Sequence, residues 1–369
     1  MTTNKNHNSP NVPNLRFPEF EGEWEKIKLK DVCTFYSGGT PSSSNKDYYT
    51  GDIPFIRSGE LHESCTELFI SKDGLNNSSA KIVHKGDLLL ALYGATSGDI
   101  AISQIEGAIN QAILCINTEQ SKEYIKAVWQ KHVQKILQTY LQGGQGNLSA
   151  DIVKNISFYF ALSKEQDKLA NFIRLLDERI ATQNKIIEDL KLLKSAIVDK
   201  LTTPQKEWKS TKIGNVLSIG SGRDYKHLED GSIPVYGTGG YMLSVDSYLY
   251  DGESVCIGRK GTINKPIFLK GKFWTVDTLF YTHTFRSITP RFCYYLFTTI
   301  DWLKYNEASG VPSLSKVTIE NISISIPDLV TQKRFCAVLD SMTDKLDIEQ
   351  KLLDAYHAQK QYLLQQIFI

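Results

Sequence analysis

The chain has 369 residues, and its 41% hydrophobic and 22% charged residues are ordinary for a soluble globular protein. This composition excludes a disordered, a collagen-like and a disulfide-scaffold chain, and the length favours two or three domains. With 42 basic and 41 acidic residues the formal net charge is +1, so any site for nucleic acid has to come from local clustering.

The first 14 residues are polar and rich in asparagine, which predicts a flexible tail over residues 1–14. They contain no apolar segment of the kind found in a secretory signal. The longest apolar run, Leu88–Tyr93, is far shorter than the ~20 residues that a membrane helix needs. The six cysteines form no CxxC pair, which favours reduced thiols over a zinc ribbon. We therefore expect a cytoplasmic protein with no membrane partner.

Residues 15–160 predict a domain of mixed helix and strand. Short runs of β-branched and large apolar residues alternate with clusters of Gly, Asn, Asp and Ser, which is typical of strands joined by loops. A helix is expected late in this segment, over Lys122–Leu141. The expected strands include Ile82–Val83, Leu88–Tyr93 and Ala112–Ile116.

A long helix is predicted over residues 161–204. It contains no Gly or Pro between Lys164 and Thr203, and Pro204 ends it because proline cannot continue a helix. Apolar side chains recur at alternating spacings of four and three residues, the pattern that forms the seam of a coiled coil. The predicted seam consists of Leu169, Ile173, Leu176, Ile180, Ile187 and Leu190.

Residues 205–327 predict a second domain of the same mixed kind. Strands are expected over Ile233–Tyr236, Ser254–Ile257 and Thr278–Thr282, and a helix over Pro290–Tyr305. Residues 328–369 then predict a second long helix with the same heptad spacing. Its predicted seam consists of Phe335, Leu339, Met342, Leu346, Leu353 and Tyr356.

The second half of the chain repeats the first. The run that begins at Trp24 returns at Trp208, 184 residues later, and the two helical seams superimpose at an offset of 166 residues. Because the seams match, pairing of the two helices is favoured over the alternative that each helix packs separately on its own domain. The predicted fold class is therefore α+β, with two similar domains on curved sheets separated by an antiparallel two-helix coiled coil. Polar residues interrupt both seams at matching places, Gln183 with Glu349 and Lys194 with Lys360.

The sequence contains no recognisable catalytic motif. A GxxxxGK[ST] phosphate loop, GxGxxG, HExxH and GxSxG are all absent, as is the Asn/Asp-Pro-Pro-Tyr/Phe tetrapeptide of adenine methyltransferases. The seven histidines are scattered, which argues against a metal site. We therefore expect no catalytic residue, no metal and no cofactor bound by this chain, although a carboxylate site without a recognisable spacing stays an open alternative.

The loops of both halves carry the residue types of a nucleic-acid reader. Arg binds guanine with its forked donors, Asn and Gln bind adenine, and Lys and backbone N–H groups hold phosphates. The clearest cluster is Gly258–Gly261, in which two cations lie on a glycine-flanked turn after a strand. For any single cation the alternative is a solvated surface charge. The predicted DNA-binding residues are Arg57, Lys72, Tyr93, Thr96, Gln145, Asn147, Arg223, Lys226, Arg259 and Lys260.

Two pairs of polar residues occupy matching places in the repeats. They are Asn110 with Gln111, and Asp277 with Thr278. Two interpretations stay open for them, as structural hydrogen-bonding residues at strand ends or as residues that contact bases.

With these features the chain resembles the specificity (S) subunits of type I restriction–modification systems. No single motif is diagnostic, but the ordered pair of motif sets covers nearly the whole chain. The motifs are the openings at Trp24 and Trp208, Gly51–Arg57, Lys85–Gly98, Asn147-Leu-Ser followed by Asn155-Ile, and Glu165–Asp177 with its echo at Thr331–Asp340.

The resemblance implies that residues 15–160 and 205–327 are target recognition domains, each reading one half of a divided, asymmetric site in double-stranded DNA. The helices 161–204 and 328–369 are implied to be spacers that dock two modification (methyltransferase) subunits. Those subunits are expected to use S-adenosylmethionine, and restriction (motor-nuclease) subunits using ATP and Mg are implied as further partners. The chain itself is implied to recognise DNA without catalysis.

Two other interpretations stay open at this stage. The first is a scaffold of two ligand-binding domains on a coiled coil that does not bind DNA. The second is a nuclease with an unrecognised carboxylate site, which metal-dependent cleavage by the purified chain would reveal.

Overall fold

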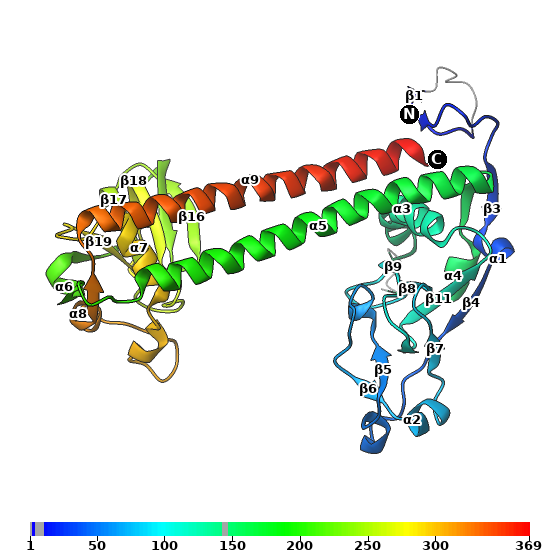
Figure 1. Cartoon of the computed structure of the whole chain (residues 1–369), viewed down its shortest axis with the longest axis horizontal. Coiled ribbons are helices and arrows are strands. Elements are labelled where there is room, and N and C mark those ends of the chain that lie inside the picture. Colours follow the sequence, from blue (N-terminus) through cyan, green and yellow to red (C-terminus); the bar gives the residue numbers. More distant parts are fainter. Residues whose placement is uncertain (1, 4–10, 142–146) are drawn as a thin grey trace. The chain divides into compact units, whose positions relative to one another are not determined.

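The computed structural model describes residues 2–3, 11–141 and 147–369. Gln145 and residues 4–10 of the predicted tail therefore lie outside the described residues. The chain divides into two compact units, unit 1 (Met1–Gln183 with Leu352–Ile369) and unit 2 (Asn184–Lys351). Two long helices, α5 (Ser163–Thr202) and α9 (Leu329–Ile367), each contribute residues to both units (Figure 1).

The described residues of unit 1 form short strands and four α-helices ahead of α5, with 3-10 turns over Lys46–Tyr49 and Ser58–Glu60. Its helices are α1 (Leu29–Val32), α2 (Lys72–Asn76), α3 (Lys122–Leu141) and α4 (Ala150–Asn155). Its strands are β1 (Thr2–Thr3), β2 (Leu15–Arg16), β3 (Glu25–Lys28), β4 (Cys33–Ser37), β5 (Ile53–Ile56), β6 (Phe69–Ile70), β7 (Lys81–Val83), β8 (Leu88–Ala91), β9 (Ile100–Ile102), β10 (Gly107–Ile109), β11 (Ile113–Thr118) and β12 (Ser157–Phe160).

Eight of these strands form two four-stranded sheets, with the orders β6-β5-β10-β7 and β4-β11-β8-β9, and the other four form the two-stranded sheets β1-β2 and β12-β3. All residues of the inner strand β8 are fully buried, because both faces of its sheet are covered. Leu88 and Leu90 pack in one apolar cluster with Trp129 of α3, and Leu89 and Ala91 pack in another on the opposite face. The continuous apolar run of the sequence is therefore a strand buried on both sides.

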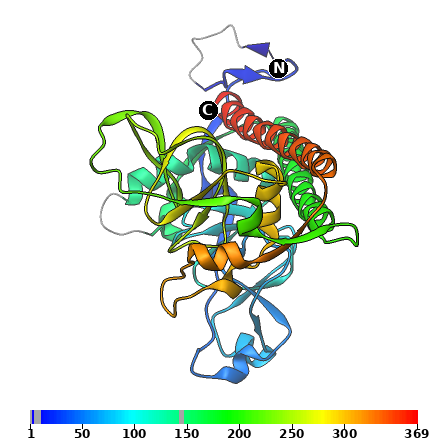
Figure 2. The ribbon, with the colours of Figure 1, turned by 90° about the vertical axis from the view of Figure 1, so that its left-hand side faces the viewer.

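Unit 2 is built on one six-stranded sheet with the order β14-β19-β17-β18-β15-β16, and Figure 2 views this unit from the side. The pair β13–β20 forms a separate two-stranded sheet. The helices are α6 (Ile213–Val216), α7 (Pro290–Thr299) and α8 (Lys316–Asn321). The strands are β13 (Lys209–Lys212), β14 (Ser218–Ser221), β15 (Asp230–Gly237), β16 (Gly240–Val245), β17 (Tyr250–Gly258), β18 (Ile267–Thr275), β19 (Leu279–His283) and β20 (Ser323–Ile326).

The two units pair their strands in the same register. In unit 1, Ala108 of β10 lies opposite Phe55 of the parallel strand β5, and in unit 2, Trp274 of β18 lies opposite Val235 of the parallel strand β15. The long strand β18 also pairs antiparallel with β17, as β9 pairs with β8 in unit 1. One strand of unit 2 thus takes the places of β9 and β10, which explains why unit 2 has a single large sheet.

The helix predicted over Lys122–Leu141 is confirmed as α3. The helix predicted over Pro290–Tyr305 is too long, because α7 ends at Thr299 and a separate 3-10 turn follows over Trp302–Tyr305. The Trp302 indole N–H donates to the Phe297 carbonyl oxygen at 2.8 Å, and the side chain is fully buried. The chain therefore turns back to bury this indole instead of continuing the helix.

Within unit 1, α5 and α9 pack against each other and run in opposite directions (Figure 1). Oδ1 of Asp177 lies 2.6 Å from Nζ of Lys360, and the guanidinium of Arg179 lies 4.4 Å from the ring centre of Tyr356. Later residues of α5 therefore contact earlier residues of α9, as expected of an antiparallel pair.

Within unit 2, Nζ of Lys194 on α5 donates to Oγ1 of Thr343 on α9 at 2.7 Å. Lys194 and Lys360, one matching pair of polar interruptions in the predicted seams, thus each have a polar partner on the opposite helix. These two lysines are half-buried hydrogen-bonding positions that match across the repeat. Every side chain of the predicted seams is buried or half-buried: Leu169, Ile173, Leu176, Ile180, Ile187, Leu190, Phe335, Leu339, Met342, Leu346, Leu353 and Tyr356.

All six cysteines are free, and all except Cys65 are buried. No helix in the described part of the chain is both long enough and apolar enough to cross a bilayer.

Candidate nucleic-acid interface

In unit 2, the predicted DNA-binding residues Arg223 and Arg259 meet at one turn, residues 276–278, which joins β18 to β19. A network of four backbone hydrogen bonds links this turn and the adjoining end of β18 to the segments of Arg223, Arg259 and Leu314. They run from N of Arg223 to O of Thr275 (2.9 Å), from N of Arg259 to O of Thr278 (2.8 Å), from N of Leu279 to O of Val276 (2.9 Å) and from N of Leu314 to O of Arg259 (2.9 Å).

Glycine at position 222 allows this convergence. An added Cβ at Gly222 would lie 1.9 Å from the Val276 carbonyl oxygen, so a larger residue would push the segment away from the turn. Gly261 follows the cations of the neighbouring loop and has a φ of +97°, a conformation that favours glycine. These glycines bring the Arg223 and Arg259 backbones close together.

The cations around this turn have no carboxylate partner. Arg223, Lys226, Arg259 and Lys260 are exposed, and the ion pairs of unit 2 join other residues. The only hydrogen bond of the Arg259 guanidinium within unit 2, which the structure describes throughout, is a long one of 3.4 Å from Nη1 to the Asp277 carbonyl oxygen. Their donors are thus available to a polyanion.

Beside the turn lies a hollow of about 600 Å³, lined by Arg259, Lys260 and Lys316 together with serine side chains. Its carboxylate, Glu307, accepts hydrogen bonds from the Thr318 hydroxyl and the Ser315 N–H, and the hydroxyl bond, chiefly, lowers the pKa of Glu307. With three cations and one carboxylate that is already hydrogen-bonded, the hollow is positively charged.

Unit 1 builds the same turn with different side chains. Its four backbone hydrogen bonds match those of unit 2, but Gly39 and Leu92 hold the places of Arg223 and Arg259. Leu92 is buried, so this turn carries no cation at either place. The bonds run from N of Gly39 to O of Ile109 (3.2 Å), from N of Leu92 to O of Ala112 (2.8 Å), from N of Ile113 to O of Asn110 (3.2 Å) and from N of Leu148 to O of Leu92 (2.8 Å).

Neutral polar groups surround the turn of unit 1. The hydroxyl of Tyr93 donates to the Gln111 carbonyl oxygen, and the hydroxyl of Thr40 donates to the Gln111 side chain. Oδ1 of Asn110 accepts from N of Ala112 at 3.0 Å, which makes Asn110 a structural residue of the turn. The N–H of Leu148 donates to the Leu92 carbonyl oxygen, and the exposed Asn147 precedes Leu148 while Tyr93 follows Leu92. Tyr93 and Asn147, both predicted to bind DNA, therefore lie next to residues of this hydrogen-bond network.

The other predicted sites of unit 1 lie apart from the hydrogen bonds of this turn. Arg57 pairs with Glu60 at 2.9 Å and with Glu67 at 2.6 Å, and these hydrogen bonds raise the pKa of its guanidinium. Its Nε and Nη2 groups therefore already donate to carboxylates. Lys72 is exposed at the start of α2, and Thr96 is half-buried in the loop after β8. The DNA contacts of these residues stay predictions.

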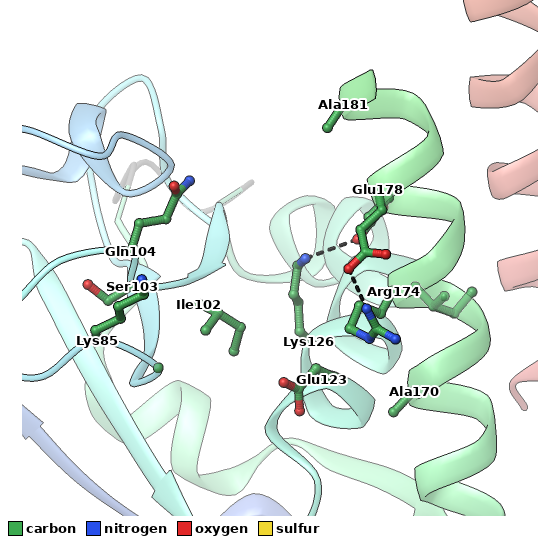
Figure 3. A pocket seen from close by; sticks show the side chains of 13 residues that line it. Lys85, Ile102, Ser103, Gln104, Glu123, Lys126, Ala170, Arg174, Glu178 and Ala181 are labelled. Carbon is green, nitrogen blue, oxygen red and sulfur yellow. Dashed lines mark hydrogen bonds and ion pairs between the residues drawn. The ribbon is translucent and has the colours of Figure 1, made fainter. Parts of the chain in front are cut away.

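Unit 1 also contains a hollow of about 560 Å³ between α5 and the sheet (Figure 3). It carries three cations and three carboxylates, and two ion pairs join them, Lys126 with Asp177 at 3.1 Å and Arg174 with Glu178. Because these charges cancel, this hollow does not suit a polyanion.

Lys316 and Ser313 are functional candidates that the sequence prediction missed. Lys316 follows the helix cap Ser315, and Ser313 forms an isolated bridge with Lys260. The repeated Leu-Ser motif that contains this cap was visible in the sequence, but its position beside the Arg259 loop depends on tertiary contacts. In the described part of the chain no group of three or more His, Cys, Asp or Glu side chains could hold a metal ion.

The sequence matches a family model described as the type I restriction modification DNA specificity domain, over residues 21–192 and again over 205–355. The MjaVIII specificity subunit of Methanocaldococcus jannaschii is 23% identical over 61% of this chain and 56% of its own length. The MjaIX specificity subunit of the same organism is 26% identical over 56% of this chain and 54% of its own length. The chain therefore spans about half the length of these two relatives. The EcoprrI specificity subunit of Escherichia coli is 21% identical over 87% of both chains.

The fold is also similar to solved structures. A type I S subunit from M. genitalium superimposes with a TM-score of 0.63 at 17% identity, over 97% of this chain and 99% of that one. A chain from a study of complex assembly and conformational transition of the type I R-M system superimposes with a TM-score of 0.60 at 15% identity. The match covers 92% of this chain and 96% of that one. The predicted fold class, two similar α+β domains with a long helix between them, is confirmed.

Proposed function

The chain belongs to the family of type I restriction–modification specificity proteins, and from this premise we propose that it recognises a divided, asymmetric sequence in double-stranded DNA. One observation carries the proposal. The same hydrogen-bonded turn occurs in both units, but different side chains surround it. Two readers with one scaffold and different contacts suit a target whose two halves have different sequences.

We propose that the chain works with modification subunits, which supply S-adenosylmethionine and the methylation of adenine, and with restriction subunits that use ATP and Mg. A similar chain comes from a study of complex assembly in a type I system, which supports partners of this kind. The chain is near neutral overall, so partners that grip the DNA backbone would add affinity. The chain itself is proposed to be non-catalytic and cytoplasmic.

The test is to produce the full chain with the modification subunits of its own system in a host without adenine methylation, and to sequence the methylated genome. We expect methylated adenines within one two-part sequence, and none when the chain is omitted. Association of the chain with the subunits and no defined methylated sequence would contradict the proposal. Metal-dependent cleavage by the chain alone would instead support a nuclease.

A further inference from the structure

The two units differ in charge at one structurally identical place. Their turns share four equivalent backbone hydrogen bonds. One position takes part with both its N–H and its carbonyl, and it is Arg259 in unit 2 but the buried Leu92 in unit 1. The residue at the middle of the turn is Asp277 in unit 2 and Gln111 in unit 1. Only unit 2 therefore presents a cation and a carboxylate side by side on this turn.

The backbone of Arg259 is held firmly at this place. Its N–H donates to Thr278 at 2.8 Å, its carbonyl accepts from Leu314 at 2.9 Å, and its Nη1 reaches the Asp277 carbonyl oxygen at 3.4 Å. The Asp277 side chain is exposed and has no hydrogen-bond or ion-pair partner in unit 2, every residue of which is described. The Asp277 carboxylate is thus free, and the Arg259 guanidinium, beside this hydrogen-bonded turn, makes only one long bond.

The chemistry of the pair points to a base pair instead of the DNA backbone. A phosphate is repelled by an adjacent carboxylate, so Asp277 makes the turn a poor phosphate site. In the major groove guanine presents two acceptors, O6 and N7, and cytosine presents a donor, N4. Arginine supplies the matching fork of donors and aspartate the matching acceptor.

On the basis of the proposed function, we infer that Arg259 and Asp277 together read one G·C base pair in the half-site bound by unit 2. Lys260 and Lys316, which line the adjoining hollow, hold the neighbouring phosphates. The equivalent turn of unit 1 has no arginine for such a contact, because the buried Leu92 takes the place of Arg259.

The first test is genome methylation by the complete modification complex carrying Arg259→Ala or Arg259→Lys. In both variants one G·C position of a single half-site becomes tolerant of other base pairs, and the other half-site stays unchanged. Arg259→Lys keeps the charge but loses the fork, so it separates a base contact from a phosphate contact. Lys209→Ala, which removes an exposed cation on the separate β13–β20 sheet, is the control and leaves the sequence unchanged.

The second test measures affinity for a target duplex in which 7-deazaguanine replaces that guanine and so removes N7. The wild-type complex is expected to lose affinity by about 5- to 150-fold, and the Arg259→Ala complex to be insensitive. Uniform weakening on all sequences, or relaxation at an A·T position, overturns the inference. If the wild-type complex methylates no defined sequence, the proposed function itself fails; if it does and Arg259→Ala leaves that sequence unchanged, only this inference fails.

Discussion

At the scale of single residues, close backbone approach decides where the candidate side chains lie. Gly222 and Gly38 occupy equivalent positions, and an added Cβ would lie 1.9 Å from the Val276 carbonyl oxygen at Gly222 and 1.8 Å from the Ile109 carbonyl oxygen at Gly38. The repeat thus keeps glycine where the backbone must pass close to the turn, while the next residue is free to differ, Arg223 in one unit and Gly39 in the other. The scaffold is repeated and the contact chemistry is not.

Gly222→Ala is expected to destabilise unit 2 by about 1–3 kcal/mol, because the new methyl group has no room beside the Val276 carbonyl. Thermal unfolding of the full chain would measure the loss. Gly310→Ala in the same unit is the matched control, since nothing lies within 4 Å of its added Cβ. Equal stability of the two variants would show that the contact at Gly222 imposes no constraint.

At the scale of elements, Asp177 joins three helices of unit 1. Its carboxylate binds Lys126 of α3 at 3.1 Å and Lys360 of α9 at 2.6 Å. Burial alone would raise the pKa of Asp177, but the hydrogen bond from Lys360 and the nearby charges of both lysines outweigh it and lower the pKa. The ionised carboxylate therefore stabilises the docking of α9 on unit 1.

Asp177→Asn is expected to lower the free energy of unfolding by about 1–3 kcal/mol at pH 7. Because the folded pKa is depressed, the stabilisation is present above the unfolded value of about 4 and is lost as pH falls through the folded value. The difference between wild type and variant should therefore persist down to about pH 4 and shrink as pH falls below it, which denaturation at several pH values would measure. Asp167→Asn, at an exposed position of α5, should show no such difference.

At the scale of the whole molecule, unit 1 is completed by a distant stretch of chain, the end of α9, whereas unit 2 is one continuous segment. The aromatic ring of Phe368 is buried in the core of unit 1, 6.3 Å from Trp24 and 5.4 Å from Tyr124 between ring centres. In unit 2 the end of α5, including Val198 and Leu201, packs on the second core. The folding of unit 1 therefore depends on residues synthesised after unit 2.

Phe368→Ala is expected to destabilise unit 1 by about 3–5 kcal/mol through the cavity it leaves. Hydrogen exchange should accelerate in α3 and β12 and stay unchanged in β17 and β19. Tyr362→Ala is the control on the same helix, since Tyr362 is 60% exposed. Faster exchange confined to unit 2 would contradict this view of the core.

The sequence by itself determined the repeat, the two long helices, the helix α3 and the family, because heptad spacing and ordered motifs are local patterns that survive without coordinates. Only the tertiary structure decided that the backbones of Arg223 and Arg259 come together beside the turn 276–278. It also decided that Arg57 forms ion pairs with Glu60 and Glu67. Such contacts join segments distant in the chain through backbone hydrogen bonds and ion pairs. They leave no periodic signal, so spacing along the chain could not predict them.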